Sequence, residues 1–150
     1  QMTVMKDMAE AATLLRSVGL RPTRQRQALA HLMLAGGPRH FSAEQLHDDA
    51  RMANVGVSLA TIYNTLHQFT NAGLLRELVI ESGRSYFDTN TSEHHHMYDE
   101  DNGTLTDIPA EAVVVNAIPA AAQGQVISRV DVVVRVRSTG SVAVTGGGKD

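Results

Sequence analysis

Hydrophobic positions in the first half of the chain recur at the three- and four-residue spacing of amphipathic helices. The first such stripe consists of Met5, Met8, Ala9, Ala12 and Leu15. Gly19 is suited to end this helix, because glycine readily adopts the left-handed conformation of a helix C-terminus. A second helix is predicted to begin after Thr23, whose side chain can cap it, and to end before Gly36.

Two more helices are predicted from their capping residues. Ser42 and Gln45 form a capping-box pattern for a helix that runs to about Met52. Ser58 can cap a fourth helix, which is predicted to end at Gly73. The first half of the chain is therefore predicted to be mainly helical.

After Gly73 the pattern changes to that of strands. Residues 74–80 and 85–88 are rich in strand-forming side chains, and the turn-forming residues 81–84 separate them, so a β-hairpin is predicted. Helices followed by a two-stranded hairpin are typical of a winged helix, in which the last helix enters a DNA groove and the hairpin contacts the flanking backbone.

The second half of the chain has weaker signals. Residues 104–108 and 126–137 favour strands, and the valines of 130–136 suggest a buried one, whereas 110–122 is Ala-rich with a weak helical signal. The predicted fold class is α+β, and it has three parts: a winged-helix DNA-binding domain over 1–88, a small α/β domain over 89–137, and a flexible tail over 138–150.

Composition excludes several classes of protein. With 43% hydrophobic and 19% charged residues, the chain is predicted to be a soluble, folded protein. It has no apolar run of the ~20 residues that a membrane span requires and no signal-peptide pattern at its start, so a cytoplasmic location is expected. There is no cysteine, so His, Asp and Glu are the available strong metal ligands.

Charge is distributed unevenly along the chain. Residues 1–88 contain nine Lys/Arg and eight Asp/Glu, whereas 89–150 contain four and eight, so the halves carry +1 and −4. The net charge of −3 argues against nucleic-acid binding unless the basic residues are clustered. Such a cluster exists within eleven residues: Arg16, Arg21, Arg24 and Arg26.

The predicted fourth helix has an uncharged outer face. Its hydrophobic stripe is Leu59, Ile62, Leu66 and Phe69, which leaves a small, hydrogen-bonding face of Ala60, Thr61, Asn64, His67 and Gln68, with Tyr63 on the flank. Asn and Gln can bind adenine edges, and a small Ala permits close approach to a groove. An ordinary amphipathic helix with a neutral outer face is the alternative. The following hairpin and the arginine cluster favour DNA binding.

Three ordered segments resemble a known family. They are Arg21-Pro-Thr-Arg-Gln-Arg26, His40-Phe-Ser-Ala-Glu44 and Val57-Ser-Leu-Ala-Thr-Ile-Tyr-Asn-Thr-Leu66. In this order and spacing they resemble signature segments of the ferric-uptake-regulator superfamily. His94-His95-His96 with Met97-Tyr-Asp-Glu-Asp-Asn-Gly103 resembles the His-rich motif of its iron-response-regulator branch in alphaproteobacteria. The resemblance covers about residues 10 to 137.

The resemblance implies a homodimer, joined through the C-terminal domain, that binds double-stranded operator DNA. Tyr63 and its helix would then enter the major groove, with Arg21 near the minor groove. The candidate DNA-binding residues are Arg21, Ser58, Ala60, Thr61, Tyr63 and Asn64.

Matching the family motif residue by residue also implies an inter-domain site for Fe, Mn or Zn. Its ligands would be His40, Asp88, His96 and Asp107. A second metal site of the family is not expected, because Val114 and Val130 fall at two ligand positions. The cysteine pairs that hold structural zinc in many relatives are absent too, with Asp99 and Asn102 in the place of one pair.

Haem is the other effector that the resemblance suggests. The Cys-Pro haem motif of some iron-response regulators is absent, so haem would need imidazole ligation from His94, His95 or His96. If this segment is a strand, His94 and His96 share one face and His95 takes the other.

The primary hypothesis is an iron-responsive transcription regulator of iron and haem metabolism genes, which binds a palindromic operator as a dimer and responds to haem or a metal. The alternative is a repressor of metal uptake activated by divalent Fe, Mn or Zn. An enzyme, as a His/carboxylate metal-dependent hydrolase, is the hypothesis from a different class, but no nucleophile elbow, phosphate loop or His-Glu-x-x-His helix supports it. A metal-storage protein would leave the neutral helix face unexplained.

Overall fold

The computed structural model describes residues 7–81 and 84–140 of the chain. These residues form two compact units, Gln1–Ser92 and Glu93–Asp150, and each unit is described by itself. No helix among the described residues is long and apolar enough to cross a membrane.

Four capped helices build most of the first unit: α1 (Met8–Ser17), α2 (Arg24–Leu34), α3 (Ala43–Met52) and α4 (Leu59–Asn71). The predicted caps are confirmed, because the side chains of Thr23, Ser42 and Ser58 each accept a hydrogen bond from a backbone N–H in the first turn. Ser42 and Gln45 form the complete capping box. Asp7 caps α1, and the predicted start at Met5 lies outside the described residues.

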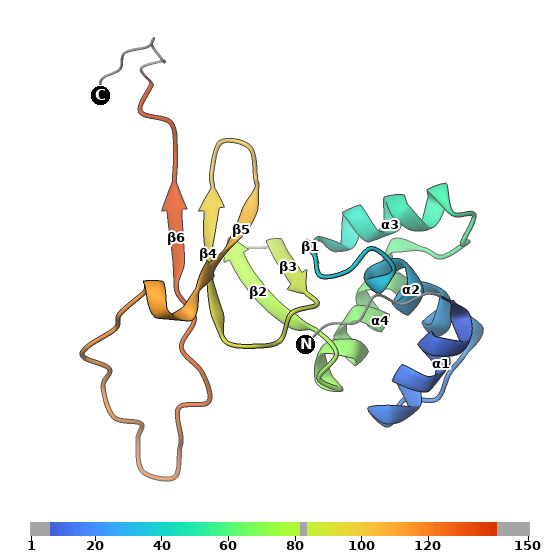
Figure 1. Ribbon diagram of the computed structural model, residues 1–150, viewed down its shortest axis with the longest axis horizontal. Coiled ribbons are helices and arrows are strands. Elements are labelled where there is room, and N and C mark those ends of the chain that lie inside the picture. The colour runs from blue at the N-terminus through green and yellow to red at the C-terminus, as the bar shows by residue number, and fades with distance from the viewer. Residues whose placement is uncertain (1–6, 82–83, 141–150) are drawn as a thin grey trace. The chain divides into compact units, whose positions relative to one another are not determined.

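The predicted hairpin is confirmed, and a third strand joins it. Strands β2 (Arg76–Glu81) and β3 (Arg84–Asp88) pair antiparallel, and β1 (His40–Phe41) pairs with the other edge of β3, which gives the order β1-β3-β2 (Figure 1). The pattern of hydrophobic residues missed β1, because two residues are too few to show a period of two. The turn residues 82 and 83 lie outside the described part of the chain.

The core of the first unit is formed where the helices pack together. Its fully buried side chains include Leu15, Leu29, Met33, Phe41, Leu46, Ile62, Leu66, Phe69 and Phe87. Phe41 of β1 and Phe87 of β3 are register partners with ring centroids 6.1 Å apart, so this core fixes the pairing of the two strands. The same pairing places the neighbouring residues His40 and Asp88 opposite each other.

The second unit contains a three-stranded sheet. Strand β4 (His94–Asp99) lies in the centre, antiparallel to β5 (Leu105–Pro109) and parallel to β6 (Val133–Val136) (Figure 1). A parallel pair requires a long crossover, and the segment that follows β5 provides it. This arrangement leaves β5 and β6 as the two edges of the sheet.

Two expectations for the second unit were wrong in extent. The weak helix over 110–122 is only the 3-10 turn η1 (Ala110–Ala112), because Pro109 and Pro119 interrupt it and residues 114–122 are exposed. The strand over 126–137 shortens to β6, where pairing with β4 begins. The valines of β6 are half-buried or exposed, not buried, because β6 is an edge strand. Most of the predicted tail, residues 141–150, lies outside the described residues.

Candidate functional site

The two faces of α4 lie as the sequence predicts. Ile62, Leu66 and Phe69 are fully buried in the core. The opposite face exposes the side chains of Ala60, Asn64, His67 and Gln68, and Thr61 is half-buried. Leu59 differs from the prediction, because it only partly joins the core. The result is an uncharged helix face with hydrogen-bonding groups available to solvent.

Ser58 and Thr61 organise the first turn of this helix. The Thr61 N–H donates to Ser58 Oγ at 3.1 Å, and the Ser58 hydroxyl donates to Thr61 Oγ1 at 3.0 Å. Ser58 thus satisfies one of the N–H groups that have no partner within the helix. The hydrogen bonds that Ser58 makes here are thus to Thr61 of its own helix.

Tyr63 is held by an acidic side chain from α3. Its hydroxyl donates to Glu44 Oε2 at 2.9 Å. Burial raises the pKa of Tyr63, and the hydrogen bond to the Glu44 carboxylate and its negative charge raise this pKa further. Tyr63 therefore stays protonated at neutral pH and keeps a fixed hydroxyl direction. Sequence reasoning did not assign a role to Glu44.

The side chain of Arg26 joins α4 to the segment before α2. Its Nη2 and Nε donate to Gln68 Oε1 at 3.0 and 3.3 Å, and its Nη1 donates to the Arg21 carbonyl at 2.8 Å. These residues border a polar hollow, which is lined by Arg21, Thr23, Gln25, Arg26, Thr61, Asn64, Thr65 and Gln68. Three predicted DNA-binding residues, Arg21, Thr61 and Asn64, thus share one hollow. Gln68, by contrast, already accepts hydrogen bonds from Arg26.

One His–Asp pair lies on the sheet of the first unit. His40 of β1 and Asp88 of β3 are directly opposite each other in the antiparallel register. Asp88 is buried, and its Oδ1 accepts a hydrogen bond from the Asn90 N–H at 2.9 Å. This bond fixes the carboxylate at the start of the linker, residues 89–93, which joins β3 to β4. Both residues were predicted as ligands, and the structure brings them together.

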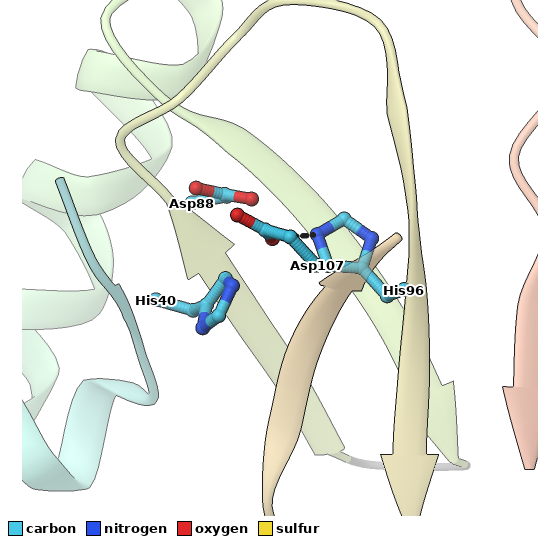
Figure 2. Close-up of side chains that lie close together, drawn as sticks. All are labelled: His40, Asp88, His96 and Asp107. Atoms are coloured by element: carbon cyan, nitrogen blue, oxygen red, sulfur yellow. Dashed lines mark ion pairs between the residues drawn. The ribbon is translucent and has the colours of Figure 1, made fainter. Parts of the chain in front are cut away.

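A second His–Asp pair lies on the sheet of the second unit. His96 of β4 and Asp107 of β5 are register partners, and His96 Nε2 lies 3.5 Å from Asp107 Oδ1. His96 is 1% exposed. Figure 2 shows both His–Asp pairs as sticks, with the interaction between His96 and Asp107 dashed.

His94 shares the carboxylate of the second pair. Its Nε2 lies 3.3 Å from Asp107 Oδ1, and its ring is 4.5 Å from that of His96, centroid to centroid. His94 was predicted as a candidate haem ligand but not as one of the four divalent-metal ligands. The signal was present, because residues two apart on a strand point to the same face.

His95 lies on the opposite face of β4, as expected for a strand. Its Nδ1 accepts a hydrogen bond from the Val132 N–H at 3.1 Å. In a neutral imidazole, an accepting Nδ1 leaves the proton on Nε2. His95 in this arrangement joins β4 to the segment that leads into β6, and it does not present an unprotonated nitrogen to a ligand.

The fold and the two sets of side chains define a class of protein. The first unit has the helices, antiparallel wing and neutral exposed helix face of a winged-helix DNA-binding domain. The second unit is a small domain that carries imidazole and carboxylate ligands on one strand pair. Together they are the features of a DNA-binding regulator whose second domain carries side chains that could ligate a metal.

Comparison with known proteins assigns the family. Residues 17–134 match the Ferric uptake regulator family, and the chain belongs to it. The peroxide-responsive repressor PerR of Staphylococcus aureus (strain Mu50) is 31% identical over 105 residues, which are 70% of each chain. The relatives are transcription regulators and not enzymes, so the hydrolase hypothesis is wrong.

Solved structures agree with this assignment. The ferric uptake regulator from Pseudomonas aeruginosa with manganese is 25% identical, with a TM-score of 0.65 over 86% of this chain and 98% of that one. The Vibrio cholerae ferric uptake regulator is 22% identical and has a TM-score of 0.66 over 84% and 98% of the two chains. The predicted α+β fold of a winged helix followed by a small α/β domain is thereby confirmed.

Proposed function

We propose that this protein is a dimeric transcription regulator whose affinity for a palindromic operator is set by one divalent ion. The ligands are His40 and Asp88 from the first unit and His96 and Asp107 from the second. The observation that carries the proposal is the cross-strand register, which places a histidine opposite an aspartate in each unit. An ion bound by both pairs would fix the orientation of the winged helix relative to the second unit.

The donor set fits such an ion. Each of the four side chains offers one ligand atom, which gives two imidazole nitrogens and two carboxylate oxygens. This set, without a thiolate, suits Fe(II), Mn(II) or Zn(II). His94 is a further candidate donor, because it shares Asp107 with His96. The bound ion would supply positive charge to two carboxylates and a link between the two units.

Within each unit, neighbouring residues hold the His–Asp pair in place before an ion binds. The bond from the Asn90 N–H holds Asp88, and the β4–β5 register holds Asp107 opposite His96. Binding therefore requires little rearrangement within either unit. The binding free energy is then available to select one orientation of the recognition helix α4, which couples ion occupancy to DNA affinity.

Haem remains the second candidate effector, and it fits the described contacts less well. An axial imidazole must present an unprotonated nitrogen to the iron. The Nε2 atoms of His94 and His96 face Asp107, and His95 Nδ1 accepts the Val132 N–H. Haem ligation would have to replace one of these contacts. Membership of the iron-response-regulator branch, and with it haem sensing, stays a prediction.

The dimer is proposed to form through the second unit. One face of its sheet carries Met97, Val134 and Val136, each more than a third exposed. Met97 and Val134 are register partners on adjacent strands, so these side chains form one continuous apolar patch. A second copy of the chain would cover this patch and satisfy the two-fold symmetry of a palindromic operator.

The proposal is tested by operator binding with and without Mn(II), Fe(II) or Zn(II), for the wild-type protein and for His40→Ala and His96→Ala. We expect the ion to raise operator affinity in the wild type by about 5- to 150-fold, the usual range of coupling between two sites. Each variant should fold normally and lose this gain. His47→Ala, a histidine on α3 outside both pairs, is the matched control.

An ion-dependent gain that survives in both His40→Ala and His96→Ala would contradict the proposed ligands. Haem is titrated in the same assay. A Soret shift that is lost in His94→Ala, His95→Ala or His96→Ala, together with haem-induced release from DNA, would replace the divalent ion by haem as the effector. No effect of any ion or of haem would contradict the whole proposal.

A further inference from the structure

Thr89, the first residue after β3, makes an unusual set of bonds to one residue of another segment. It is 1% exposed. Its hydroxyl accepts a hydrogen bond from the Arg39 N–H at 2.9 Å and donates to the Arg39 carbonyl at 3.2 Å. Its own N–H also donates to the Arg39 carbonyl, at 3.1 Å. Both backbone groups of Arg39 are therefore bonded to Thr89.

These bonds extend the pairing of a very short strand. β1 has two residues, and its register with β3 pairs His40 with Asp88. Arg39 and Thr89 are the next pair in this register. In a regular antiparallel ladder the Arg39 N–H would donate to the Thr89 carbonyl, but here the Thr89 hydroxyl takes the place of that carbonyl. The main chain can thus leave the sheet after Thr89 without losing the pairing next to His40.

The side chain of Arg39 is held at its other end by the helices. Its Nη1 donates to Asp49 Oδ2 of α3 at 3.0 Å and lies 3.5 Å from the Leu32 carbonyl of α2. Its guanidinium carbon is 5.0 Å from the centre of the Phe41 ring. The residue before His40 is therefore held through its backbone by Thr89 and through its side chain by α2, α3 and β1.

We propose that Thr89 is a positioning residue for the metal pair of the first unit. Its hydroxyl closes β1 onto β3 and sets His40 opposite Asp88 before an ion binds. Without this hydroxyl, β1 would open more often, and ion binding would have to restore the pairing at a cost in affinity. This inference rests on the proposed metal site, but its structural part concerns the ion-free protein.

Thr89→Val tests the inference, because it removes the hydroxyl and keeps the branched shape. In the ion-free protein, hydrogen exchange of the segment around Arg39 and His40 should become faster than in the wild type. Mn(II) affinity should fall by about five- to thirtyfold, the range that follows from the loss of one or two hydrogen bonds. Thr89→Ser, which keeps the hydroxyl, should restore both values toward the wild type.

Thr91→Val is the matched control, since Thr91 lies in the same linker and is exposed. Unchanged exchange and unchanged Mn(II) affinity in Thr89→Val would overturn the inference. So would an equal effect in Thr89→Ser, which would show that the hydroxyl is not the cause. If Thr89→Val does not fold, Thr89→Ser and Thr89→Ala are compared instead, and equal exchange in these two would also overturn it.

The two proposals fail in distinguishable ways. If the proposed function is wrong, His40→Ala will bind Mn(II) as tightly as the wild type does. If only the present inference is wrong, His40→Ala will lose Mn(II) binding but Thr89→Val will not weaken it. Faster hydrogen exchange in ion-free Thr89→Val would show that the hydroxyl holds β1 against β3, even in the first case.

Discussion

At the scale of single residues, the proposed DNA-binding face includes exposed side chains and side chains that are held by a partner on another element. Asn64 is exposed on α4, whereas Tyr63 and Gln68 each bond a partner on another element. Base contacts give specificity, and contacts to phosphates give the salt-dependent remainder of the affinity. Asn64 is therefore the clearest candidate for a direct base contact, whereas the Gln68 Oε1 atom already accepts hydrogen bonds from Arg26.

Glu44 is predicted to set the direction of the Tyr63 hydroxyl and to raise its pKa beyond the increase that burial causes. Glu44→Ala removes the acceptor and its charge, so the pKa of Tyr63 should fall toward the ordinary tyrosine value. The measurement is an ultraviolet pH titration of tyrosine ionisation, with Tyr63→Phe to identify the Tyr63 signal. Glu44→Gln keeps an acceptor without the charge and should lie between the wild type and Glu44→Ala. An unchanged titration in Glu44→Ala would contradict the assignment.

At the scale of elements, α4 depends on its cap as well as on its buried stripe. Helix ends leave backbone groups without partners, and Ser58 supplies one at the end of α4 that carries Thr61 and Asn64. The same helix is fixed from outside by Glu44 of α3 and Arg26 of α2. The proposed recognition helix is thus held by its own N-cap, by α3 through Tyr63 and by α2 through Gln68.

Ser58→Ala should lower the free energy of unfolding by about 1 kcal/mol, because it removes the N-cap of α4. The measurement is urea denaturation followed by helical circular dichroism. Ser17→Ala, at the exposed C-terminal end of α1, is the control and should change the free energy by less than about 0.5 kcal/mol. Equal effects of the two substitutions would show that the Ser58 cap does not stabilise the fold.

At the scale of the whole molecule, the proposed dimer and the proposed ion use opposite faces of one sheet. Side chains alternate along β4, so His94 and His96 point to one face, and His95 and Met97 point to the other. One strand can therefore carry ligands and an interface without conflict. This arrangement also explains why an apolar face can remain exposed in a single copy of the chain.

Val134→Asp should weaken the dimer, because it places a charge in the middle of the apolar patch of the second unit. The measurement is sedimentation equilibrium over a range of protein concentrations, where the variant should be monomeric at concentrations that keep the wild type dimeric. Val79→Asp is the matched control, since Val79 is 70% exposed on β2 of the other unit. A dimer that withstands Val134→Asp but not Val79→Asp would place the interface in the first unit.

Much of the candidate site follows from the sequence, but the contacts that hold its side chains in place do not. The outer face of α4 was predicted from residue types and spacing, and the ligand residues were predicted from the family resemblance. The roles of Glu44, Arg39 and Thr89 were not predicted, because no local pattern, not even the signature segment that ends at Glu44, indicates which distant partner each side chain contacts. Their roles come from partners 19 and 50 residues away.

The sequence by itself determined the four helices, the caps of α2, α3 and α4, the hairpin and the family, because these features depend on residues within a few positions of one another. The tertiary structure decided the short strand β1 and the sharing of Asp107 by His94 and His96. It also decided that the strand predicted over 126–137 is limited to β6, where the chain pairs with β4. The physical reason is that strand pairing and side-chain contacts join distant segments. Their register depends on what the rest of the core allows, as Phe41 and Phe87 show by setting His40 opposite Asp88.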